Sequence, residues 1–317
     1  MAMGIRRYYL KKIMIKRYAV ILIDVLLLFS SIIYNIIKGI YKLCIPDAEK
    51  SVLGEVVLIT GTGHGIGREL ALKYASLGAT VVCWDINEQG NNETVEEIKQ
   101  NGVSRAYGYK CDVSNREEVI ETAEKVKKEV GDVTILINNA GIMPSYHFVD
   151  HTPELIKRVF DINVLSHHWI LQAFLPNMIQ NDYGHIVSIS SMAGLFGLPN
   201  IVPYCSSKFA VRGLMEALCE ELRVQNGGKP SNIKFTTIYP YMVNTGLCKK
   251  PLYRFQSMQL ISIKEAVDAI IKAQRRNIRE VSIPSYWFYI NSFMRCMPHS
   301  CREHTSNFLK IGVDVED

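Results

Sequence analysis

From residue 54 onward, short apolar runs alternate with longer stretches in which apolar residues recur at helical spacing. The short runs are rich in β-branched residues and end at turn residues, which is typical of strands. We expect seven strands, at 56–60, 80–85, 106–111, 133–138, 185–190, 233–239 and 280–283. The helices expected between them lie near 65–77, 91–99, 116–130, 152–179, 204–225 and 263–275. Strands that alternate with helices pair in parallel through right-handed crossovers, so the pattern predicts an α/β fold with one doubly wound, Rossmann-type sheet.

A different pattern precedes this body. Residues 18–37 form an apolar run that is long enough to cross a bilayer core as a helix, and basic residues flank both of its ends. A signal peptide is disfavoured because the run is too long and no small-residue cleavage site follows it. Asp24 lies inside the run, where a carboxylate at membrane depth is costly, so a shallow or hairpin insertion stays open beside a full crossing. The sequence therefore predicts an N-terminal membrane-associated helix.

The charge of the chain is unevenly distributed. The net charge is +5, but residues 1–45 hold eight Lys or Arg against the single acid Asp24, which leaves the remaining residues at −2. A nearly neutral body argues against nucleic acid as a partner, whereas the basic N-terminus suits anionic lipid headgroups. The basic excess before the apolar run favours a cytosolic N-terminus. A single crossing would then place the body in a lumen, and a monotopic insertion would leave it cytosolic.

The eight cysteines form no CxxC pair and show no Cys/His spacing typical of zinc, so we expect no metal site. Reduced thiols in a reducing compartment are the favoured interpretation. A disulfide between Cys296 and Cys301 stays open because the two are close in sequence.

These patterns divide the chain into four parts. We expect a basic N-terminus and membrane anchor over 1–45, a linker over 46–53, a catalytic domain over 54–284 and a C-terminal extension over 285–317. Residues 246–262 contain no clear periodic element, and we expect them to form a mobile loop beside the substrate.

The first strand leads into a glycine-rich turn that opens a helix. The turn has the form TGxxxGxG, and Ile66 occupies the slot where a three-glycine motif would have its last glycine. Such a turn lets backbone N–H groups and a helix N-terminus meet a pyrophosphate. A glycine cluster alone is weak evidence, but its place between a strand and a helix favours a dinucleotide site. The candidate residues are Gly61, Gly65, Ile66 and Gly67.

Further cofactor contacts are expected where the next strands end. Asp85 ends the second strand and can accept hydrogen bonds from the adenosine ribose, so we expect NAD to be preferred, with NADP still possible. A solvated turn aspartate is the alternative. Asp112 and Val113 follow the third strand, where the adenine ring should lie. A small polar turn after the fourth strand can approach the cofactor; it comprises Asn139, Ala140 and Gly141.

Tyr204 and Lys208 are four residues apart on an expected helix and therefore share one face. A free phenol has a pKa of about 10, which is too high for efficient proton exchange near neutrality. A neighbouring ammonium and a positively charged nicotinamide ring both favour the phenolate, and Lys208 can also hold the nicotinamide ribose. Ser191, at the end of the fifth strand, can hydrogen-bond the substrate oxygen, and Asn163 could hold a water that relays protons.

Taken together, this ordered motif set resembles the short-chain dehydrogenase/reductase family over residues 54–284. Local runs at 84–87, 204–210 and 243–246 are similar to its membrane-anchored branch, which contains 17-β-hydroxysteroid dehydrogenases 11 and 13 and the epidermal retinol dehydrogenases. The resemblance implies that Tyr241, which stands where many members have glycine, narrows the nicotinamide side of the pocket. It implies a catalytic set of Asn163, Ser191, Tyr204 and Lys208. It also adds cofactor contacts at Pro240, Val243 and Thr245.

The substrate pocket should be lined by the residues that follow Ser191 and Pro240, which are largely apolar and suit a lipid-like alcohol or carbonyl. Met192 and Tyr241 are the expected substrate contacts beside Ser191 and Tyr204. His147 and His151 are interpreted as loop histidines rather than bases. The aromatic run 286–289 could close the pocket, touch the bilayer or pack in the core.

The sequence therefore predicts an NAD(P)-dependent oxidoreductase that interconverts a hydrophobic alcohol, such as a retinoid, steroid or fatty alcohol, with its carbonyl form. The alternative is a catalytically silent scaffold on a membrane or lipid droplet, but a scaffold needs none of the four catalytic residues. We also expect a homodimer bound to the membrane of the endoplasmic reticulum or to lipid droplets.

Overall fold

The computed structural model describes residues 2–102, 105–229 and 231–316, and the chain divides into two compact units, Met1–Glu49 and Lys50–Asp317. The first unit consists mainly of helix α1 (Ala2–Cys44). Within it, Lys16–Lys42 is long and apolar enough to cross a membrane, and an 18-residue window of this stretch has a mean hydropathy of 2.4. Polar side chains in this stretch bond back to their own helix, as Ser30 Oγ does to Leu26 O (2.8 Å). Bonding of this kind lowers the cost of placing a hydroxyl in apolar surroundings.

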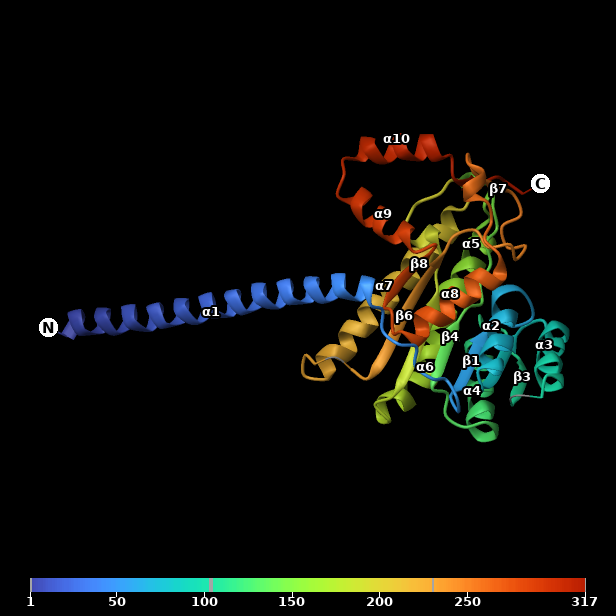
Figure 1. Cartoon of the computed structure of the whole chain (residues 1–317), viewed down its shortest axis with the longest axis horizontal. Helices are drawn as coiled ribbons and strands as arrows, with labels where there is room; N and C mark the ends of the chain where they lie inside the picture. Colours follow the sequence, from blue (N-terminus) through green and yellow to red (C-terminus); the bar gives the residue numbers. More distant parts are fainter. Residues whose placement is uncertain (1, 103–104, 230, 317) are drawn as a thin grey trace. The chain divides into compact units, whose positions relative to one another are not determined.

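The second unit is built on a seven-stranded sheet in the order β3-β2-β1-β4-β5-β6-β8, in which every neighbouring pair is parallel (Figure 1). This confirms the doubly wound fold expected from the alternating pattern. From β1 the chain adds β2 and β3 toward one edge of the sheet, and from β4 it adds the later strands toward the other edge. This change in strand order between β1 and β4 creates the crevice where open α/β sheets bind ligands. The strands are β1 (Val56–Thr60), β2 (Thr80–Asp85), β3 (Ala106–Lys110), β4 (Ile135–Asn138), β5 (Gly184–Ile189), β6 (Ile233–Pro240) and β8 (Glu280–Ile283).

Helices cover both faces of this sheet, and each face has its own core. One core holds α2 (Gly65–Ser76), α3 (Glu88–Gln100) and α8 (Ile263–Arg275), with Tyr74 and Ile270 fully buried. The opposite core holds α4 (Arg116–Glu129), α6 (Ser166–Gln180) and α7 (Val202–Gln225). Burial on both faces explains why the inner strands are nearly continuous apolar runs, whereas the edge strand β3 is only partly buried.

The helix expected near 152–179 does not run uninterrupted, and this is a correction to the sequence pattern. It begins as α5 (Pro153–Phe160), where the Thr152 side chain caps the N–H of Leu155. A π-helical turn, Asp161–Leu165, then separates α5 from α6. This turn has five residues, which are too few to show a periodicity of their own in the sequence. The turn carries Asn163.

The C-terminal segment returns over the ends of the sheet strands. Helices α9 (Tyr286–Arg295) and α10 (His299–Leu309) form an arch, and the short strand β9 (Gly312–Val313) pairs antiparallel with β7 (Pro251–Leu252) (Figure 1). The tail is further tied down because Asn200 Nδ2 donates to Val313 O (2.9 Å) and Ser145 Oγ donates to Asp314 O (2.9 Å). The loop expected to be mobile, 246–262, therefore contains a paired strand.

Two smaller expectations can be placed on this fold. Residues 50–53 of the expected linker lie within the second unit, where Val52 is buried and Lys50 N donates to Arg275 O (2.9 Å). Cys296 and Cys301 are both exposed free thiols, so the disulfide left open by the sequence is not formed.

Candidate active site

The turn between β1 and α2 has a backbone that only glycine accommodates well. Gly61 and Gly65 have φ angles of +77° and +59°, a region that L side chains rarely adopt. At Gly67, an added Cβ would lie 1.9 Å from Gly61 O, so a side chain there would break the turn. The turn therefore brings bare backbone to the N-terminus of α2, and this geometry fits the pyrophosphate of a dinucleotide.

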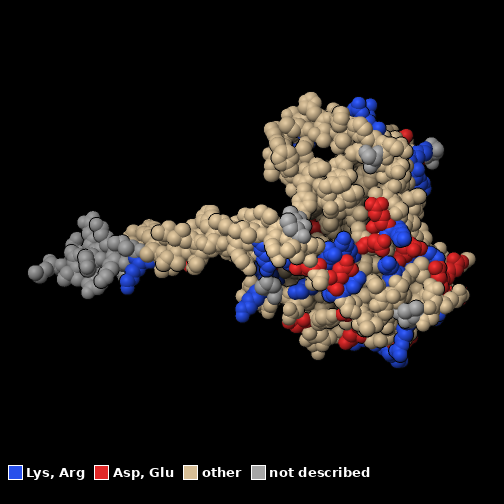
Figure 2. All heavy atoms as spheres, in the orientation of Figure 1, with Lys and Arg blue, Asp and Glu red and all other residues tan. Residues whose placement is uncertain are grey.

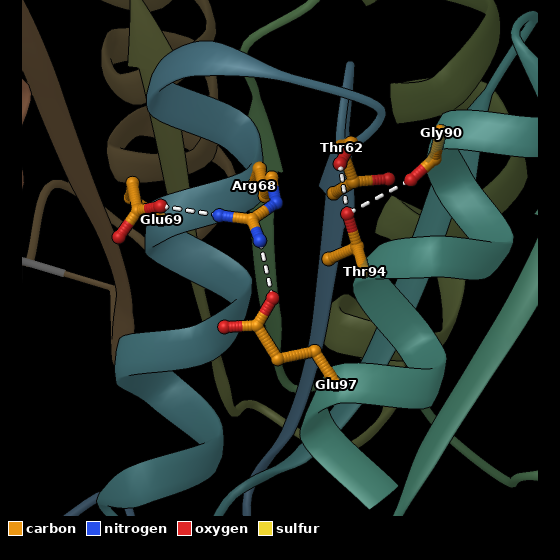
Figure 3. Close-up of polar contacts among 6 residues, drawn as sticks. All are labelled: Thr62, Arg68, Glu69, Gly90, Thr94 and Glu97. Atoms are coloured by element: carbon orange, nitrogen blue, oxygen red, sulfur yellow. Dashed lines mark hydrogen bonds and ion pairs between the residues drawn. The ribbon is translucent and has the colours of Figure 1, made fainter. Parts of the chain in front are cut away.

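Contacts from α3 hold this turn in place (Figure 3). Thr94 Oγ1 donates to the Thr62 carbonyl (2.9 Å) and to the Gly90 carbonyl (3.0 Å). On the same side, Arg68 of α2 pairs with Glu69 (2.7 Å) and with Glu97 of α3. The bond from Thr94 to Thr62 fixes the glycine-rich turn to α3, and the Arg68–Glu97 pair joins α2 to α3.

Asp85 lies beside the turn at the end of β2. Its Oδ2 accepts from the N–H of Gly63 (2.8 Å) and its Oδ1 accepts from the N–H of Asn87 (2.7 Å). A Cβ at Gly63 would lie 3.0 Å from Asp85 Cγ, so a side chain there would displace the carboxylate. The carboxylate is thus fixed at the edge of the crevice, and its role in choosing between NAD and NADP stays a prediction.

The loops after β3 and β4 lie at the same edge of the crevice as Asp85. Asp112 Oδ1 accepts from the N–H (2.9 Å) and the hydroxyl (2.7 Å) of Ser114, while Val113 is buried in the α4-side core. After β4, the N–H groups of Asn139 and Ala140 both donate to Thr60 Oγ1 at 3.0 Å. The hydroxyl of Thr60 therefore holds the Asn139–Ala140 turn against the end of β1.

The four expected catalytic residues come from three elements that meet at the end of β5. Ser191 follows β5, Tyr204 and Lys208 lie in the first turns of α7, and Asn163 lies in the π-helical turn. Lys208 Nζ donates to Ile189 O (2.9 Å) and lies 5.5 Å from the centroid of the Tyr204 ring.

The π-helical turn aims the Asn163 amide at the loop after β4. Asn163 Nδ2 donates to Ile142 O (2.9 Å) and its Oδ1 accepts from Ile142 N (2.9 Å), while Nδ2 also donates to Ser207 Oγ (3.0 Å) of α7. A Cβ at Gly141 would lie 3.2 Å from Asn163 Oδ1 and 3.5 Å from Lys208 Nζ. Gly141 thus lets Asn163 and Lys208 approach the same point.

Burial dominates the electrostatics of this group. It raises the pKa of the Tyr204 phenol to about 12, and the hydrogen bond with Ser191 acts in the opposite direction. It also lowers the pKa of Lys208 to about 8. In the chain without cofactor, the pKa of the phenol therefore lies above that of a free phenol, because desolvation outweighs the hydrogen bond with Ser191.

A pocket of about 480 Å³ opens beside these residues. Eleven expected site residues line it: Ile66, Asn139, Gly141, Ser191, Met192, Tyr204, Lys208, Pro240, Tyr241, Val243 and Thr245. The others lie outside the lining, in the loops just described: Gly61, Gly65, Gly67, Asp85, Asp112, Val113, Ala140 and Asn163. Gly65 still borders the pocket, because a Cβ there would lie 3.3 Å from Thr245 Cβ.

The outer wall of the pocket belongs to α9, α10 and the tail. Trp287 comes from the aromatic run that was expected to close the pocket, touch the bilayer or pack in the core, whereas sequence reasoning missed the others, which include Asn291, Leu309, Ile311 and Val313. The alternation of Leu309, Ile311 and Val313 is the signal that could have identified the tail as an extended, half-buried segment. Figure 2 shows a hollow at the arch of α9 and α10, framed on this face by uncharged residues.

The aromatic run 286–289 divides between the pocket and the surface. Trp287 is 6% exposed and stacks on Tyr241 with ring centroids 6.4 Å apart, whereas Tyr286 and Tyr289 are 51% and 60% exposed. One face of α9 thus closes the pocket while the other leaves aromatic rings outside. His151 is buried but bonds to the His147 carbonyl (3.2 Å), and neither histidine lines the pocket.

Comparison with known proteins agrees with this geometry. The family model for short chain dehydrogenases matches residues 55–252. Human 17-beta-hydroxysteroid dehydrogenase 13 is 42% identical over 275 residues, which cover 87% of this chain and 89% of the relative. Human epidermal retinol dehydrogenase 2 is 41% identical over 266 residues, which cover 83% and 85%.

Among solved structures, a short chain dehydrogenase/reductase from Burkholderia phymatum in complex with NAD matches with a TM-score of 0.69 and 26% identity. The match covers 76% of this chain and 93% of that one. The chain therefore belongs to the short-chain dehydrogenase family, and it is an oxidoreductase that acts on CH–OH groups with a nicotinamide cofactor.

Proposed function

We propose that this enzyme interconverts a hydrophobic secondary or allylic alcohol, of the retinoid, steroid or fatty-alcohol class, with its carbonyl form. The observation that carries the proposal is the pocket, where Ser191, Tyr204 and Lys208 meet walls made mostly of apolar side chains. Apolar walls favour the binding of a lipid-like skeleton, while the few polar groups at one end orient the reacting oxygen.

In the proposed mechanism, Tyr204 exchanges the proton of the substrate oxygen. During alcohol oxidation, the ionised phenol accepts the hydroxyl proton while the Ser191 hydroxyl donates a hydrogen bond to the same oxygen. The nicotinamide ring, when bound, supplies the hydride acceptor or donor. Lys208 holds the nicotinamide ribose, and Asn163 holds a water that passes the proton onward.

The pKa values indicate what this mechanism requires. With the phenol at about 12 in the chain by itself, Tyr204 is almost wholly protonated near neutrality. Positive charge on the nicotinamide ring and on Lys208 favours the phenolate, so binding of the oxidised cofactor is expected to activate the tyrosine. Carbonyl reduction needs the protonated phenol and has no such requirement.

Asp85 supports a preference for NAD. Its carboxylate lies beside the glycine-rich turn, where it would accept hydrogen bonds from the ribose hydroxyls and repel a 2′-phosphate.

Helix α1 supports attachment to a membrane. Its apolar stretch has the length and composition of a bilayer-spanning segment, and it is preceded by basic residues that suit anionic lipid headgroups. We propose the endoplasmic reticulum or lipid droplets as the site of attachment and a homodimer as the assembly.

The test offers the full-length protein retinol, a steroid alcohol and fatty alcohols with either cofactor, and follows the fluorescence of the reduced cofactor. We expect alcohol-dependent reduction of NAD, and we expect Ser191→Ala to lower kcat about 100-fold because the substrate oxygen loses its donor. Ser206→Ala is the matched control, since Ser206 is exposed on α7 and bonds only to its own helix. Cofactor binding without turnover of any alcohol would instead support the scaffold alternative.

A further inference from the structure

Polar side chains gather on one face of the otherwise apolar helix α1. Between positions 18 and 37 the helix carries four Asp, Ser or Asn residues. Three of them, Asp24, Ser31 and Asn35, fall within an arc of about 40° around the helix axis, given the α-helical repeat. The fourth, Ser30, lies on another side of the helix, where its hydroxyl donates to Leu26 O (2.8 Å). We call Asp24, Ser31 and Asn35 the polar stripe of α1.

Asp24 finds no hydrogen-bond donor on its own helix. An ionised carboxyl group only accepts, and the backbone N–H groups in mid-helix already bond to the preceding turn. No donor is offered by the side chains one turn away, which are those of Val20, Ile21, Leu27 and Leu28. Asn35 is partly satisfied, since its Nδ2 donates to Ser31 O (2.8 Å). In the hydrocarbon of a bilayer, where water is absent, the other polar groups of the stripe need a partner outside the helix.

The polar stripe is too narrow for a helix that lies flat on a membrane surface. Helices of that kind carry a broad, strongly charged face. In α1, by contrast, an 18-residue window has a mean hydropathy of 2.4, and the apolar Leu28 lies on the stripe between Asp24 and Ser31. From residue 29, the middle of Lys16–Lys42, the rise of an α-helix places Asp24 and Asn35 about 8 Å and about 9 Å along the axis. Both lie within the hydrocarbon when the helix crosses, because this layer extends roughly 15 Å on either side of the bilayer centre.

We propose that α1 crosses the membrane beside α1 of a second copy of this chain, with the two polar stripes facing each other. Positions 24, 28, 31, 35, 38 and 42 advance by four and three residues in turn, which is the seam of two helices wound in parallel. A parallel pair also follows from the flanking basic residues, since they orient every copy in the same way. This inference rests on the membrane attachment proposed above, and it names the surface through which two copies meet.

A second copy matches the chemistry of the polar stripe, whereas a lipid chain does not. The Asn35 amide both donates and accepts hydrogen bonds, so two such amides can pair with each other. Two Asp24 carboxyl groups can share one proton, and the protonated group then donates to the other. Hydrocarbon chains offer neither donors nor acceptors. The pairing therefore accounts for a carboxyl group within an apolar stretch.

The test forms disulfide bonds between copies of the full-length protein in phosphatidylcholine vesicles. The parent chain carries Cys44→Ser, Cys296→Ser and Cys301→Ser, so that neither the thiol at the end of α1 nor the exposed thiols of the second unit react. Ser31→Cys places a thiol on the polar stripe, and the matched control Ser30→Cys places one on another side of the helix. After mild oxidation, we expect at least about five times more cross-linked dimer from Ser31→Cys, because only the stripe faces the second copy.

Asn35→Leu tests the hydrogen bonds of the stripe. Added to the Ser31→Cys chain, it should lower the association constant of the dimer about threefold to thirtyfold, as is typical when hydrogen bonds between membrane helices are lost. The cross-linked fraction at increasing ratios of lipid to protein measures this change. Ser30→Leu is the matched control and should leave the association constant unchanged, because the Ser30 hydroxyl bonds to its own helix.

Equal cross-linking of the two thiols, or none from either, would overturn the inference, as would an unchanged association constant in Asn35→Leu. Labelling of the Ser31→Cys thiol by a membrane-impermeant maleimide would also overturn it, because the stripe would then face water. Flotation of the same vesicles separates two failures. Protein that floats without cross-linking refutes the pairing alone, whereas protein that does not float refutes the proposed membrane attachment and this inference with it. Titration with the reduced cofactor reports whether each variant is folded.

Discussion

At the scale of single residues, the site depends on groups whose pKa values burial has shifted from their ordinary ones. Lys208 is 3% exposed and Tyr204 is 6% exposed. Their spacing on one helix face was predictable from the sequence, because residues four apart always meet. Their burial was not predictable, since it depends on the loop after β5 and on a C-terminal tail that lies a hundred residues away. The sequence therefore predicted that Tyr204 and Lys208 lie together, but it gave no sign that burial raises the pKa of the phenol while the cofactor is absent.

The carboxylate of Asp85 provides a test of cofactor choice. Asp85→Ala should weaken NAD binding about tenfold and relax discrimination against NADP, because the ribose loses an acceptor and the 2′-phosphate loses a repelling charge. Fluorescence titration with both reduced cofactors measures the change. Asp132→Ala, at an exposed site, should leave both affinities unchanged. Equal use of NAD and NADP by the unmodified protein would contradict the assignment.

The buried lysine links stability to pH. Because folding lowers the pKa of Lys208 from its ordinary 10.5 to about 8, the unfolded chain binds more protons between these values. The free energy of unfolding should therefore rise with pH between about 8 and 10.5. Below pH 8, Lys208 is protonated in both states, so it should cause no change of this free energy with pH. Lys208→Met should remove that rise. Chemical denaturation of both proteins across this pH range measures it, and parallel curves would refute the link.

At the scale of elements, the strands and most helices followed from periodicity, whereas irregular elements did not. A single π-helical turn of five residues is too short to give a sequence signal of its own, yet it directs Asn163 toward the loop after β4. The strand pair β7–β9 was missed for another reason: each strand has two residues, and its pairing depends on a contact across sixty positions. Both missed features lie at the site, where local rules give way to tertiary contacts.

The tail strand β9 should contribute directly to substrate binding. Val313 is 2% exposed and packs with Met143, Ile201 and Tyr204 at the pocket wall. Val313→Ala should raise KM for an apolar alcohol about threefold to tenfold, because apolar contact area is lost, while cofactor affinity stays the same. Val315→Ala, two residues further on, is the control. An unchanged KM in the Val313 variant would show that the tail does not line the working pocket.

At the scale of the whole molecule, the chain separates a basic, apolar first unit from a nearly neutral catalytic unit. Charge and hydropathy alone predict a basic, apolar N-terminal part and a nearly neutral remainder, because neither property depends on tertiary contacts. The C-terminal end of the expected linker could not be predicted from the sequence. Nothing in the sequence distinguishes Val52 from an exposed apolar residue, yet it is buried in the second unit.

Charges placed in the apolar stretch should release the protein from membranes. The double variant Leu22→Lys and Phe29→Lys should shift the protein from the membrane to the soluble fraction in alkaline flotation, since each lysine at membrane depth costs about 3 kcal/mol. The control adds the same charges at Val149 and Val224, which are exposed on the second unit. Persistent flotation of the α1 variant would contradict anchoring by this helix.

The most direct measurement for the account as a whole is the turnover of Tyr204→Phe with an alcohol that the unmodified enzyme oxidises. Phenylalanine keeps the ring and removes only the hydroxyl, so titration with the reduced cofactor should give an affinity within about twofold of the unmodified protein. We expect kcat to fall by at least about 100-fold, as is typical when a positioned acid or base is lost, while Tyr183→Phe at an exposed site remains fully active. If Tyr204→Phe instead turned over at the unmodified rate, this tyrosine would not be the group that moves the proton.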